Sequence, residues 1–295
     1  MARKASPPPA VAKSKRASRR TTPSPETLAA LGLERLTGLV LSETARNPTF
    51  RKLVTAAIAG LQGPDAVAAL VDRRLTALER ARGYIDWQKR RAFVADLDAT
   101  VSTITRELLP LDPHQALDRL VRFLIGSAGV LDRVDDSTGQ VLGIYERASH
   151  EAAAMAASLP KGEAAAFATR LVGHLSADPF GIIEALLLTL VPSLPDDAVA
   201  PLDGDLAEAA EAARPREDKD WNRQMRWMRL VRLRQALADR RGDVDGFVAL
   251  ERMVSPERPD RVAVAERLLA AGRAAEALDW IIQPQKRGIG VVTRA

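Results

Sequence analysis

The chain contains no cysteine, which excludes disulfide bonds and zinc sites built from thiolates. This absence also favours a reducing compartment. Histidine is scarce as well: His114, His150 and His174 are the only three, and none has a second histidine three or four residues away. We therefore expect no metal site.

Long apolar segments are also missing. The longest apolar run, from Ile182 to Val191, is interrupted by Glu184 and Thr189 and is far shorter than the roughly 20 residues that span a bilayer. No apolar stretch near the N-terminus has the character of a secretory signal peptide. We expect a cytoplasmic protein with no membrane segment.

The sequence lacks the short motifs of common enzyme classes. It contains no GxxxxGK[ST] loop for nucleotide phosphates, no GxGxxG dinucleotide fingerprint and no GxSxG nucleophile elbow. No residue is therefore assigned a catalytic or cofactor-binding role. We expect a protein that is not an enzyme and that holds no cofactor.

Aromatic residues make up only 4% of the chain, whereas apolar residues as a whole make up 46%. The apolar set is mostly Ala, Leu and Val, and Ala and Leu form helices at low conformational cost. In the segment FVADLDATVSTITREL, which begins at Phe93, apolar residues recur mostly at intervals of three or four, and no segment shows the alternation of a strand. We predict an all-α fold.

Several helix starts are marked by a capping residue followed by proline, because the N–H that proline lacks has no partner in the first turn of a helix. Asp86 is expected to cap a further helix, from Trp87 to Leu108, with Trp87 packed into the core. The cap-proline pairs are Ser24-Pro25, Asn47-Pro48, Asp112-Pro113, Asp178-Pro179 and, in a weaker form, Gly63-Pro64.

Composition divides the chain into four parts. Residues 1–24 are rich in Pro, Ser, Lys and Arg and are predicted to form a disordered basic tail, because they bury too little apolar surface to offset their ordering entropy. Residues 25–191 form an N-terminal helical block. Residues 192–220 are rich in proline and acidic residues and are predicted to be a linker with one short helix over Asp205–Ala213. Residues 221–295 form a C-terminal block of helical hairpins.

The C-terminal block contains two similar units, LADRRGDVDGFVALE and LLAAGRAAEALDWI, each of which reads helix, glycine turn, helix. Gly242 and Gly272 mark the turns, where a left-handed backbone is expected, and Trp280 is expected to close the last hairpin. The spacing between the two glycines is near that of tetratricopeptide-like repeats. We predict helical hairpins stacked as an α-solenoid-like array, with an ordinary helical hairpin as the alternative for this block.

The net charge of +5 comes from the tail. Its seven cations have no acidic counterpart, which leaves 36 basic and 38 acidic side chains in the remainder. Overall charge therefore gives no reason for the body of the protein to bind nucleic acid, whereas the tail is a candidate for that role. The tail cations are Arg3, Lys4, Lys13, Lys15, Arg16, Arg19 and Arg20.

The segment RVDDSTGQV, residues 133–141, gathers polar residues in the manner of a site. Ser137 and Gln140 fit a capping box, in which each side chain bonds the backbone of the other. Asp135 and Asp136 would then lie at a helix N-terminus, where negative charge is favourable, with Arg133 as their partner. We favour a structural loop formed by Arg133, Asp135, Asp136 and Ser137 over a binding role, and a binding role over catalysis.

The segment WNRQMRWMRLVRLRQALADRR, residues 221–241, contains seven arginines and one acidic residue, Asp239. Its apolar residues surround the expected helix, unlike those of a simple amphipathic helix. The favoured interpretation is a packed helix whose arginines pair with the acidic segment before it. The alternative is an arginine and aromatic surface for an acidic partner or nucleic acid, with the candidate partner-binding residues Trp221, Arg223, Arg226, Trp227 and Arg229.

Three segments together resemble a family of uncharacterised bacterial all-helical proteins, known only as a domain of unknown function. They are YIDWQKRRAFVADLD, RVDDSTGQV and LLAAGRAAEALDWI. The resemblance runs from about Thr27 to the C-terminus and implies tetratricopeptide-like helical repeats with no known activity. It also implies that this chain is shortened at its C-terminus, and it assigns no catalytic residue.

These observations favour a protein-protein interaction scaffold whose partner is another protein. Stacked helical repeats offer an extended binding surface and seldom house a reaction. The alternative is a nucleic-acid-associated protein that uses the basic tail and the Arg/Trp-rich helix 221–241. No membrane and no metal is expected as a partner.

If nucleic acid binds, the tail should supply most of the attraction. We predict binding that is independent of sequence, with a log–log salt slope no steeper than about −6, because each phosphate contact contributes roughly 0.9. Deletion of residues 1–24 should abolish this binding in a filter-binding titration against duplex DNA. Binding that survives the deletion would show that the tail is not the binding segment.

Overall fold

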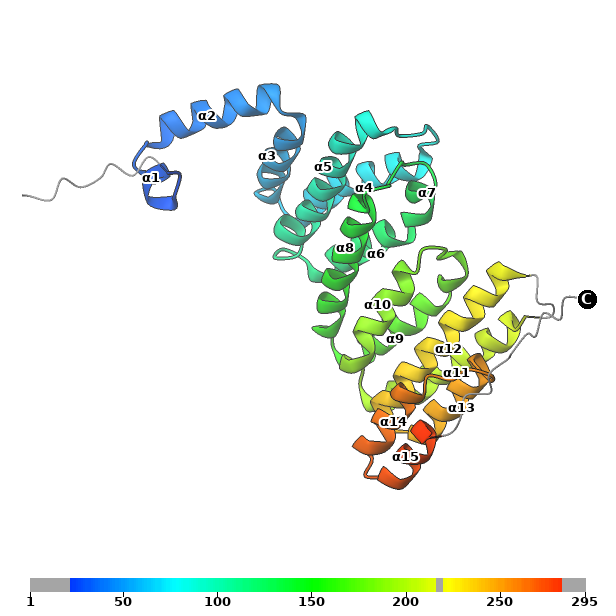
Figure 1. The fold of residues 1–295 in the computed structure, drawn as a ribbon. Helices are drawn as coiled ribbons and strands as arrows, with labels where there is room; N and C mark the ends of the chain where they lie inside the picture. Colours follow the sequence, from blue (N-terminus) through cyan, green and yellow to red (C-terminus); the bar gives the residue numbers. More distant parts are fainter. Residues whose placement is uncertain (1–21, 216–219, 283–295) are drawn as a thin grey trace, which may run out of the picture. The chain divides into compact units, whose positions relative to one another are not determined.

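All regular structure in the described part of the chain is helical (Figure 1). The computed structural model describes residues 22–215 and 220–282, and these residues form fifteen α-helices and no strand. The predicted all-α fold is confirmed. The seven cations of the predicted basic tail lie outside the described residues.

The described residues divide between Arg51 and Lys52 into two compact units. The first contains α1 (Pro25–Ala29), α2 (Leu33–Arg46) and the beginning of α3 (Pro48–Gly60). Ser24 caps α1, as predicted: its hydroxyl accepts from the backbone N–H of Thr27. No residue of α1 or α2 is buried.

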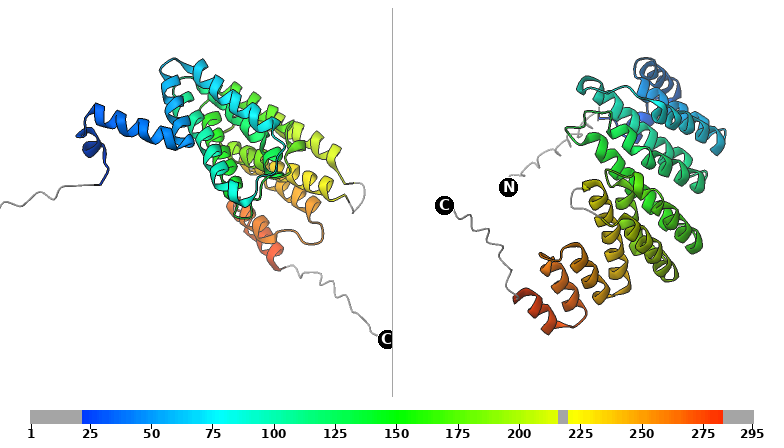
Figure 2. Two further views of the ribbon diagram at one scale, coloured as in Figure 1. Left: turned by 90° about the horizontal axis from the view of Figure 1, so that it is seen from above. Right: turned by 90° about the vertical axis from the view of Figure 1, so that its right-hand side faces the viewer.

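In the second unit, helices stack one after another in the order of the sequence, as the right-hand view of Figure 2 shows. Alternate helices α4, α6, α8, α10 and α12 contact each other in series, which confirms the predicted array. The helices are α4 (Pro64–Arg80), α5 (Trp87–Thr103), α6 (Pro113–Ile125), α7 (Ser127–Leu131), α8 (Gln140–Ala157), α9 (Lys161–Val172), α10 (Ile182–Leu190), α11 (Asp196–Ala213), α12 (Trp221–Arg241), α13 (Val244–Val254), α14 (Arg261–Ala270) and α15 (Ala274–Ile282).

The core of the second unit is built mostly from Ala, Leu and Val. One large cluster of buried side chains extends from Ala59 to Leu250, and inside it the rings of Phe123 and Tyr145 stack with their centroids 4.5 Å apart. A second, smaller cluster joins the end of α12 to α13, α14 and α15, and Trp280 packs against it. Trp280 therefore closes the last hairpin, as predicted.

Most of the predicted helix starts are confirmed. Helices α1, α3, α4 and α6 each begin at the proline of a cap-proline pair. Asp86 caps α5 by accepting from the backbone N–H groups of Gln88 and Lys89. Regular helix continues from α5 through one π-helical turn, Ile104–Leu108, so this element ends where the periodicity predicted.

The start of α10 differs from the prediction. Pro179 lies outside the helix, which begins three residues later at Ile182, after Gly181 in the left-handed region (φ 74°). Asp178 still provides the cap, because its buried carboxylate accepts from the backbone N–H groups of Ile182, Ile183 and Glu184.

Helix α8 begins with the same arrangement. Gly139 is left-handed (φ 69°), and Asp136, three residues before it, accepts from the N–H groups of Val141 and Leu142. The predicted capping box between Ser137 and Gln140 is wrong, because the N-cap position is Gly139 and the hydroxyl of Ser137 accepts from Arg90 instead. Both helices thus follow an Asp-x-x-Gly sequence, and α8 and α10 pack against each other.

The loop before α8 is tied to the loop before α5. Ile85 donates its N–H to the carbonyl of Arg133 (2.8 Å) and accepts from the N–H of Asp135 (3.1 Å). Arg90 of α5 bonds the carbonyl of Asp135 and the hydroxyl of Ser137.

The partners of the loop's charged residues differ from those predicted. Arg90, and not Arg133, is the cation nearest the carboxylate of Asp135, at 3.8 Å. Arg133 instead donates to the carbonyl of Gly83 and lies over the ring of Phe93. Hydrogen bonds therefore join two segments that are far apart in the sequence, YIDWQKRRAF and RVDDSTGQV. Trp87 does not pack into the core: it is 67% exposed.

Residues 196–213, inside the segment that composition indicated as a linker, form α11, which is longer than the short helix expected over Asp205–Ala213. Val199, Leu202 and Leu206 lie in the main core cluster. The sequence underestimated this helix because Pro201 interrupts the apolar pattern, yet it is accommodated in the helix.

The predicted glycine turns of the C-terminal block are confirmed. Gly242 ends α12 with a left-handed backbone (φ 67°), and Gly272 follows α14 with φ 75°. A residue with a β-carbon is strained at such angles, which explains the glycine at both turns.

We predict that Asp136→Ala lowers the free energy of unfolding by about 1–2 kcal/mol, because two N–H groups of α8 lose their acceptor. Asp132→Ala is a matched control: Asp132 is exposed and should change stability by less than about 0.5 kcal/mol. Urea unfolding followed by circular dichroism measures both. Equal effects of the two substitutions would refute the assigned cap.

Candidate functional site

Helix α12 carries the predicted partner-binding residues and packs against both α10 and α11. Asp220 begins the helix by accepting from the N–H of Arg223. Trp227 is only 7% exposed and belongs to the main core cluster, so it packs inside and is not available to a partner.

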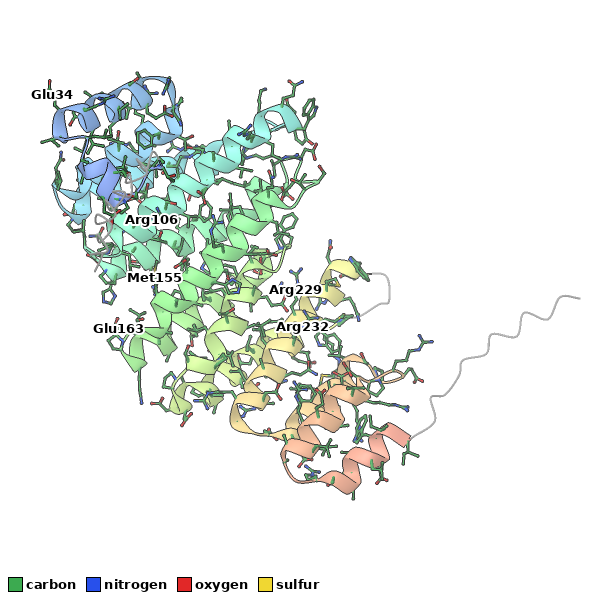
Figure 3. All side chains as sticks on the ribbon, turned by 60° about the vertical axis from the view of Figure 1, so that its left-hand side comes forward. Glu34, Arg106, Met155, Glu163, Arg229 and Arg232 are labelled. Carbon is green, nitrogen blue, oxygen red and sulfur yellow. The ribbon has the colours of Figure 1, made fainter. Side chains whose placement is uncertain are left out.

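Arg229 holds α12 against the start of α10. Its guanidinium donates to the carbonyls of Asp178 and Pro179 and forms an ion pair with Glu184, with Nε 3.2 Å from Oε2. Arg232, one turn later, lies 3.5 Å from the other oxygen of Glu184. Figure 3 shows both arginines together on α12. These two arginines therefore serve the packing of α12 on α10.

Glu184 is the buried end of this contact, with only 7% of its side chain exposed. Burial raises the pKa of Glu184, because the charged carboxylate loses water, while Arg232 and Arg229 oppose the shift. A buried carboxylate of this kind depends on its arginine partners.

The remaining arginines of α12 mostly face α11. Arg223 donates to the carbonyls of Ala212 and Arg214 at the end of α11, which have no partner within that helix. Further along, Arg234 and Arg241 both bind Asp203, and Arg240 binds Asp196. The favoured interpretation of the segment, arginines paired with the preceding acidic segment, accounts for these residues.

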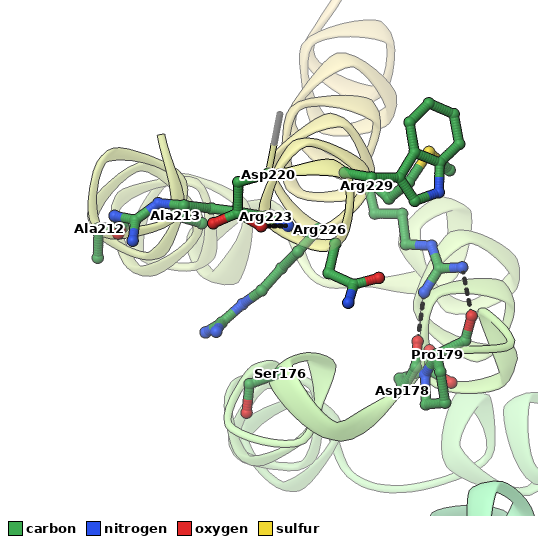
Figure 4. Close-up of a pocket in the computed structure, with 12 residues that line it drawn as sticks. Ser176, Asp178, Pro179, Ala212, Ala213, Asp220, Arg223, Arg226 and Arg229 are labelled. Carbon is green, nitrogen blue, oxygen red and sulfur yellow. Dashed lines mark hydrogen bonds between the residues drawn. The ribbon is translucent and has the colours of Figure 1, made fainter. Parts of the chain in front are cut away.

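Two of the five candidates are left available to a ligand. Trp221 is 70% exposed. Arg226 is exposed and forms no ion pair or hydrogen bond with any other described residue. Both line a cavity of about 620 Å³, which we call the α12 pocket. In Figure 4, Arg226 extends into the open space of the pocket, away from the bonds that Arg229 makes to Asp178 and Pro179.

The walls of the α12 pocket come from three regions of the chain: the turn before α10, the end of α11 and the start of α12. Its lining residues are Ser176, Asp178, Pro179, Ala212, Ala213, Asp220, Trp221, Asn222, Arg223, Met225, Arg226 and Arg229. A guanidinium, an indole and a hydroxyl are groups that bind a carboxylate or another anion by charge-assisted hydrogen bonds, with an aromatic contact beside it.

Sequence reasoning missed Ser176, Asp178 and Glu184 as parts of this region. Asp178 was recognised only as a helix cap. Glu184 gave a usable signal, since it is the single charged residue in the longest apolar run and therefore required a buried partner. The loop residues Arg133, Asp135, Asp136 and Ser137 do not line the pocket.

The described residues contain no group of three or more acidic or histidine side chains that could hold a metal ion. Within the same ranges, no helix combines the length and apolar character that crossing a bilayer requires.

We predict that Arg229→Ala lowers the free energy of unfolding by about 3 kcal/mol, because it leaves the buried carboxylate of Glu184 with one distant partner. Arg226→Ala, three residues away on the same helix, should change it by less than about 0.5 kcal/mol. Urea unfolding of the two variants measures the difference. Comparable losses would mean that Arg226 also has a structural partner.

The raised pKa of Glu184 predicts a pH dependence. The native state holds this proton at higher pH than the unfolded chain does, so the group's stabilising contribution is present below the ordinary glutamate pKa of about 4.3 and is lost as pH rises through the raised value. Glu184→Gln has no such proton. The free energy of unfolding of the wild type minus that of Glu184→Gln should therefore fall as the pH increases from about 4.3 through the raised pKa. A difference that rises with pH in urea unfolding would show that the arginines outweigh burial.

The model of a protein family, described as a family of unknown function (DUF6880), matches residues 18–294. This match confirms the resemblance to a family without a known activity, over nearly the whole chain. No curated protein and no solved structure matches the chain.

Proposed function

We propose a function for this chain, which belongs to the family of unknown function DUF6880, from the geometry of the α12 pocket: it is a non-enzymatic interaction scaffold that binds an acidic segment of another protein. The observation that carries this proposal is the contrast between Arg226 and its neighbours. Arg223, Arg229 and Arg232 are engaged within the protein, and Arg226 alone extends into the pocket.

An unpaired guanidinium and an exposed indole that line one cavity suit a protein partner. Trp and Arg are among the side chains that most often dominate protein-protein binding energy, and both line one cavity here. Arg226 would pair with a carboxylate of the partner, and Trp221 would cover an apolar side chain next to it. A cavity of about 620 Å³ is large enough for a few side chains of a peptide.

The array itself supports a scaffold. Stacked helices present an extended surface, and helical-repeat proteins typically use such a surface to bind partners. The two left-handed glycines, Gly242 and Gly272, support a tetratricopeptide-like character for the C-terminal hairpins. A cytoplasmic location, in a bacterial cell, fits a chain without cysteine.

The alternative function is association with nucleic acid through the basic tail and the Arg/Trp-rich helix. Of the arginines of α12, most are engaged in packing, which leaves the tail as the principal candidate for that role. The tail lies outside the described residues, so this alternative is tested by the deletion of residues 1–24 described above.

The proposal is tested by affinity capture with the full-length chain and quantitative mass spectrometry. Wild type is compared with Trp221→Ala/Arg226→Gln, and with a matched control, Leu61→Ala/Arg106→Gln, which changes an exposed apolar residue and an exposed arginine elsewhere. Partners that use the pocket should be lost at least about tenfold by the pocket variant, since loss of two such contacts costs at least about 1.4 kcal/mol. The control should retain them.

A second arm of the same experiment tests the chemistry of the partner. A glutamate-rich peptide should compete for the captured partners, and the same peptide with glutamine in place of glutamate should not. If the pocket variant captures the same proteins in the same amounts as the wild type, the α12 pocket is not the binding site.

A further inference from the structure

Two large aromatic side chains project into solvent at the start of α5. Tyr84 is 65% exposed and Trp87 is 67% exposed, three residues apart. The chain contains only two tyrosines and four tryptophans, so exposing two of these six within one short segment is unusual for this protein. Exposed aromatics that cluster mark a binding surface more often than isolated exposed side chains do.

This segment is held in place from several sides. Ile85, between the two aromatics, is hydrogen-bonded to the backbone of the loop before α8 in both directions. Arg133 of that loop donates to the carbonyl of Gly83. Asp86 caps α5 directly before Trp87. The backbone that carries Tyr84 and Trp87 is therefore fixed, and a ligand would bind with little cost in ordering it.

Three of the cations around these aromatics have no carboxylate partner among the described residues, whereas Lys89 pairs with Asp86 at 3.7 Å and Arg90 pairs with Asp135 at 3.8 Å. Arg80 and Arg91 are exposed and form no ion pair with any described residue. Arg82 donates only to the carbonyls of Glu79 and Ala81 at the end of α4, so it keeps its full charge.

The carboxylates close to this surface are directed at backbone N–H groups. Asp86 accepts from two N–H groups of α5, Asp136 from two of α8, and Asp135 from that of Ser137. They oppose an incoming anion less than free carboxylates would, because their charge is partly balanced by the helix N-termini.

We propose that Tyr84, Trp87, Arg80, Arg82 and Arg91, the aromatic–arginine surface, bind single-stranded nucleic acid, with bases stacked on the two rings and phosphates on the arginines. Aromatic rings interleaved with cations are the composition of surfaces that bind single strands without sequence preference. Tyr84 and Trp87 are the only exposed large hydrophobic residues from 80 to 92, so the aliphatic contacts of a typical protein-protein interface are missing here.

The surface continues along α5. Trp87 and Arg91 lie one turn apart on the same face of the helix. Arg91 also lines a groove of about 540 Å³ between α5 and α8, and the other lining residues include Val94, Asp98, Ile144 and Arg147. A strand that stacks on Trp87 would have this groove as its continuation, with Arg91 as the cation available to it, because Arg147 pairs with Asp98 in the same groove.

This proposal is independent of the proposed function, because it concerns other residues and another ligand. It also differs from binding by the basic tail, which offers charge and no aromatic ring. A tail binds phosphates whether or not bases are attached, whereas a stacking surface requires the bases. The presence or absence of bases in the ligand therefore separates the two.

The experiment uses the full-length chain and two fluorescein-labelled ligands of equal length and charge: a dodecamer of deoxythymidine and an abasic dodecamer with the same phosphates. Fluorescence anisotropy gives both dissociation constants. Wild type should bind the thymidine oligomer at least tenfold more tightly, since each stacked base contributes roughly 5- to 150-fold. Equal affinity for the two ligands would overturn the proposal.

Variants locate the preference. Tyr84→Ala/Trp87→Ala should abolish the preference for bases and leave the affinity for the abasic oligomer within about twofold, because only stacking is lost. Trp221→Ala, which removes the other strongly exposed tryptophan, should keep the preference. Both changes affect exposed residues, and circular dichroism verifies that the variants are folded.

Arg91→Gln provides a second, independent measurement. It should weaken binding of both oligomers and reduce the salt slope by roughly 0.7, the value for one phosphate contact on a single strand. A preference for bases that survives Tyr84→Ala/Trp87→Ala, or that is lost in Trp221→Ala, would assign stacking to another part of the chain and refute this surface.

Discussion

Pairing of arginine with carboxylates on neighbouring helices is the interaction on which the array depends. The core consists mostly of Ala, Leu and Val. These side chains bury apolar surface, but their similar shapes allow more than one register between neighbouring helices. Ion pairs supply the register: Arg122 of α6 binds Asp72 and Glu79 of α4, and Arg267 of α14 binds Asp239 of α12. Arg229 and Glu184 do the same for α12 and α10. We infer that the exposed pairs among them matter more for choosing one packing arrangement than for net stability, because exposed pairs contribute little free energy.

An arginine without a partner is informative in a chain that pairs so many of them. Arg226 extends into the α12 pocket (Figure 4). Arg80 of α4 and Arg91 of α5 precede and follow the two exposed aromatic residues Tyr84 and Trp87 in the sequence. Arg35, Arg73 and Arg106 are also exposed and form no ion pair or hydrogen bond with a described residue. What distinguishes the two places is an exposed tryptophan: Trp221 lines the α12 pocket with Arg226, and Trp87 lies one turn before Arg91. An exposed arginine and an exposed indole on one surface are suited to a ligand that brings negative charge and a flat or apolar group.

The sequence predicted the helical class, most helix starts, the glycine turns and the bounds of the arginine-rich helix, because these depend on residues close together in the chain. It failed where an Asp-x-x-Gly turn sets the start of a helix, and where a tertiary contact decides. Asp136 caps α8 across a left-handed glycine that the capping-box pattern ignores, and the same Asp-x-x-Gly arrangement displaced the start of α10. Trp87 was expected in the core, but its burial depends on whether the loops before α5 and α8 cover it. They do not cover it, and the side chain is exposed. The sequence singled out five candidate residues of α12, but the contacts made in the fold divide them: Trp227 is buried, Arg223 and Arg229 serve packing, and Trp221 and Arg226 are exposed.

The central claim, that packing consumes most arginines and leaves a few for ligands, is tested most directly by chemical footprinting. The folded full-length protein is treated with phenylglyoxal, which modifies free guanidinium groups, and the rate at each arginine is followed by mass spectrometry. Arg226 and Arg91 should react at rates near those of the unfolded chain, whereas Arg229, Arg234 and Arg122 should be protected by their carboxylate and carbonyl partners. If Arg229 and Arg234 react as fast as Arg226, the arginines of α12 are not divided between packing and binding, and the account is wrong.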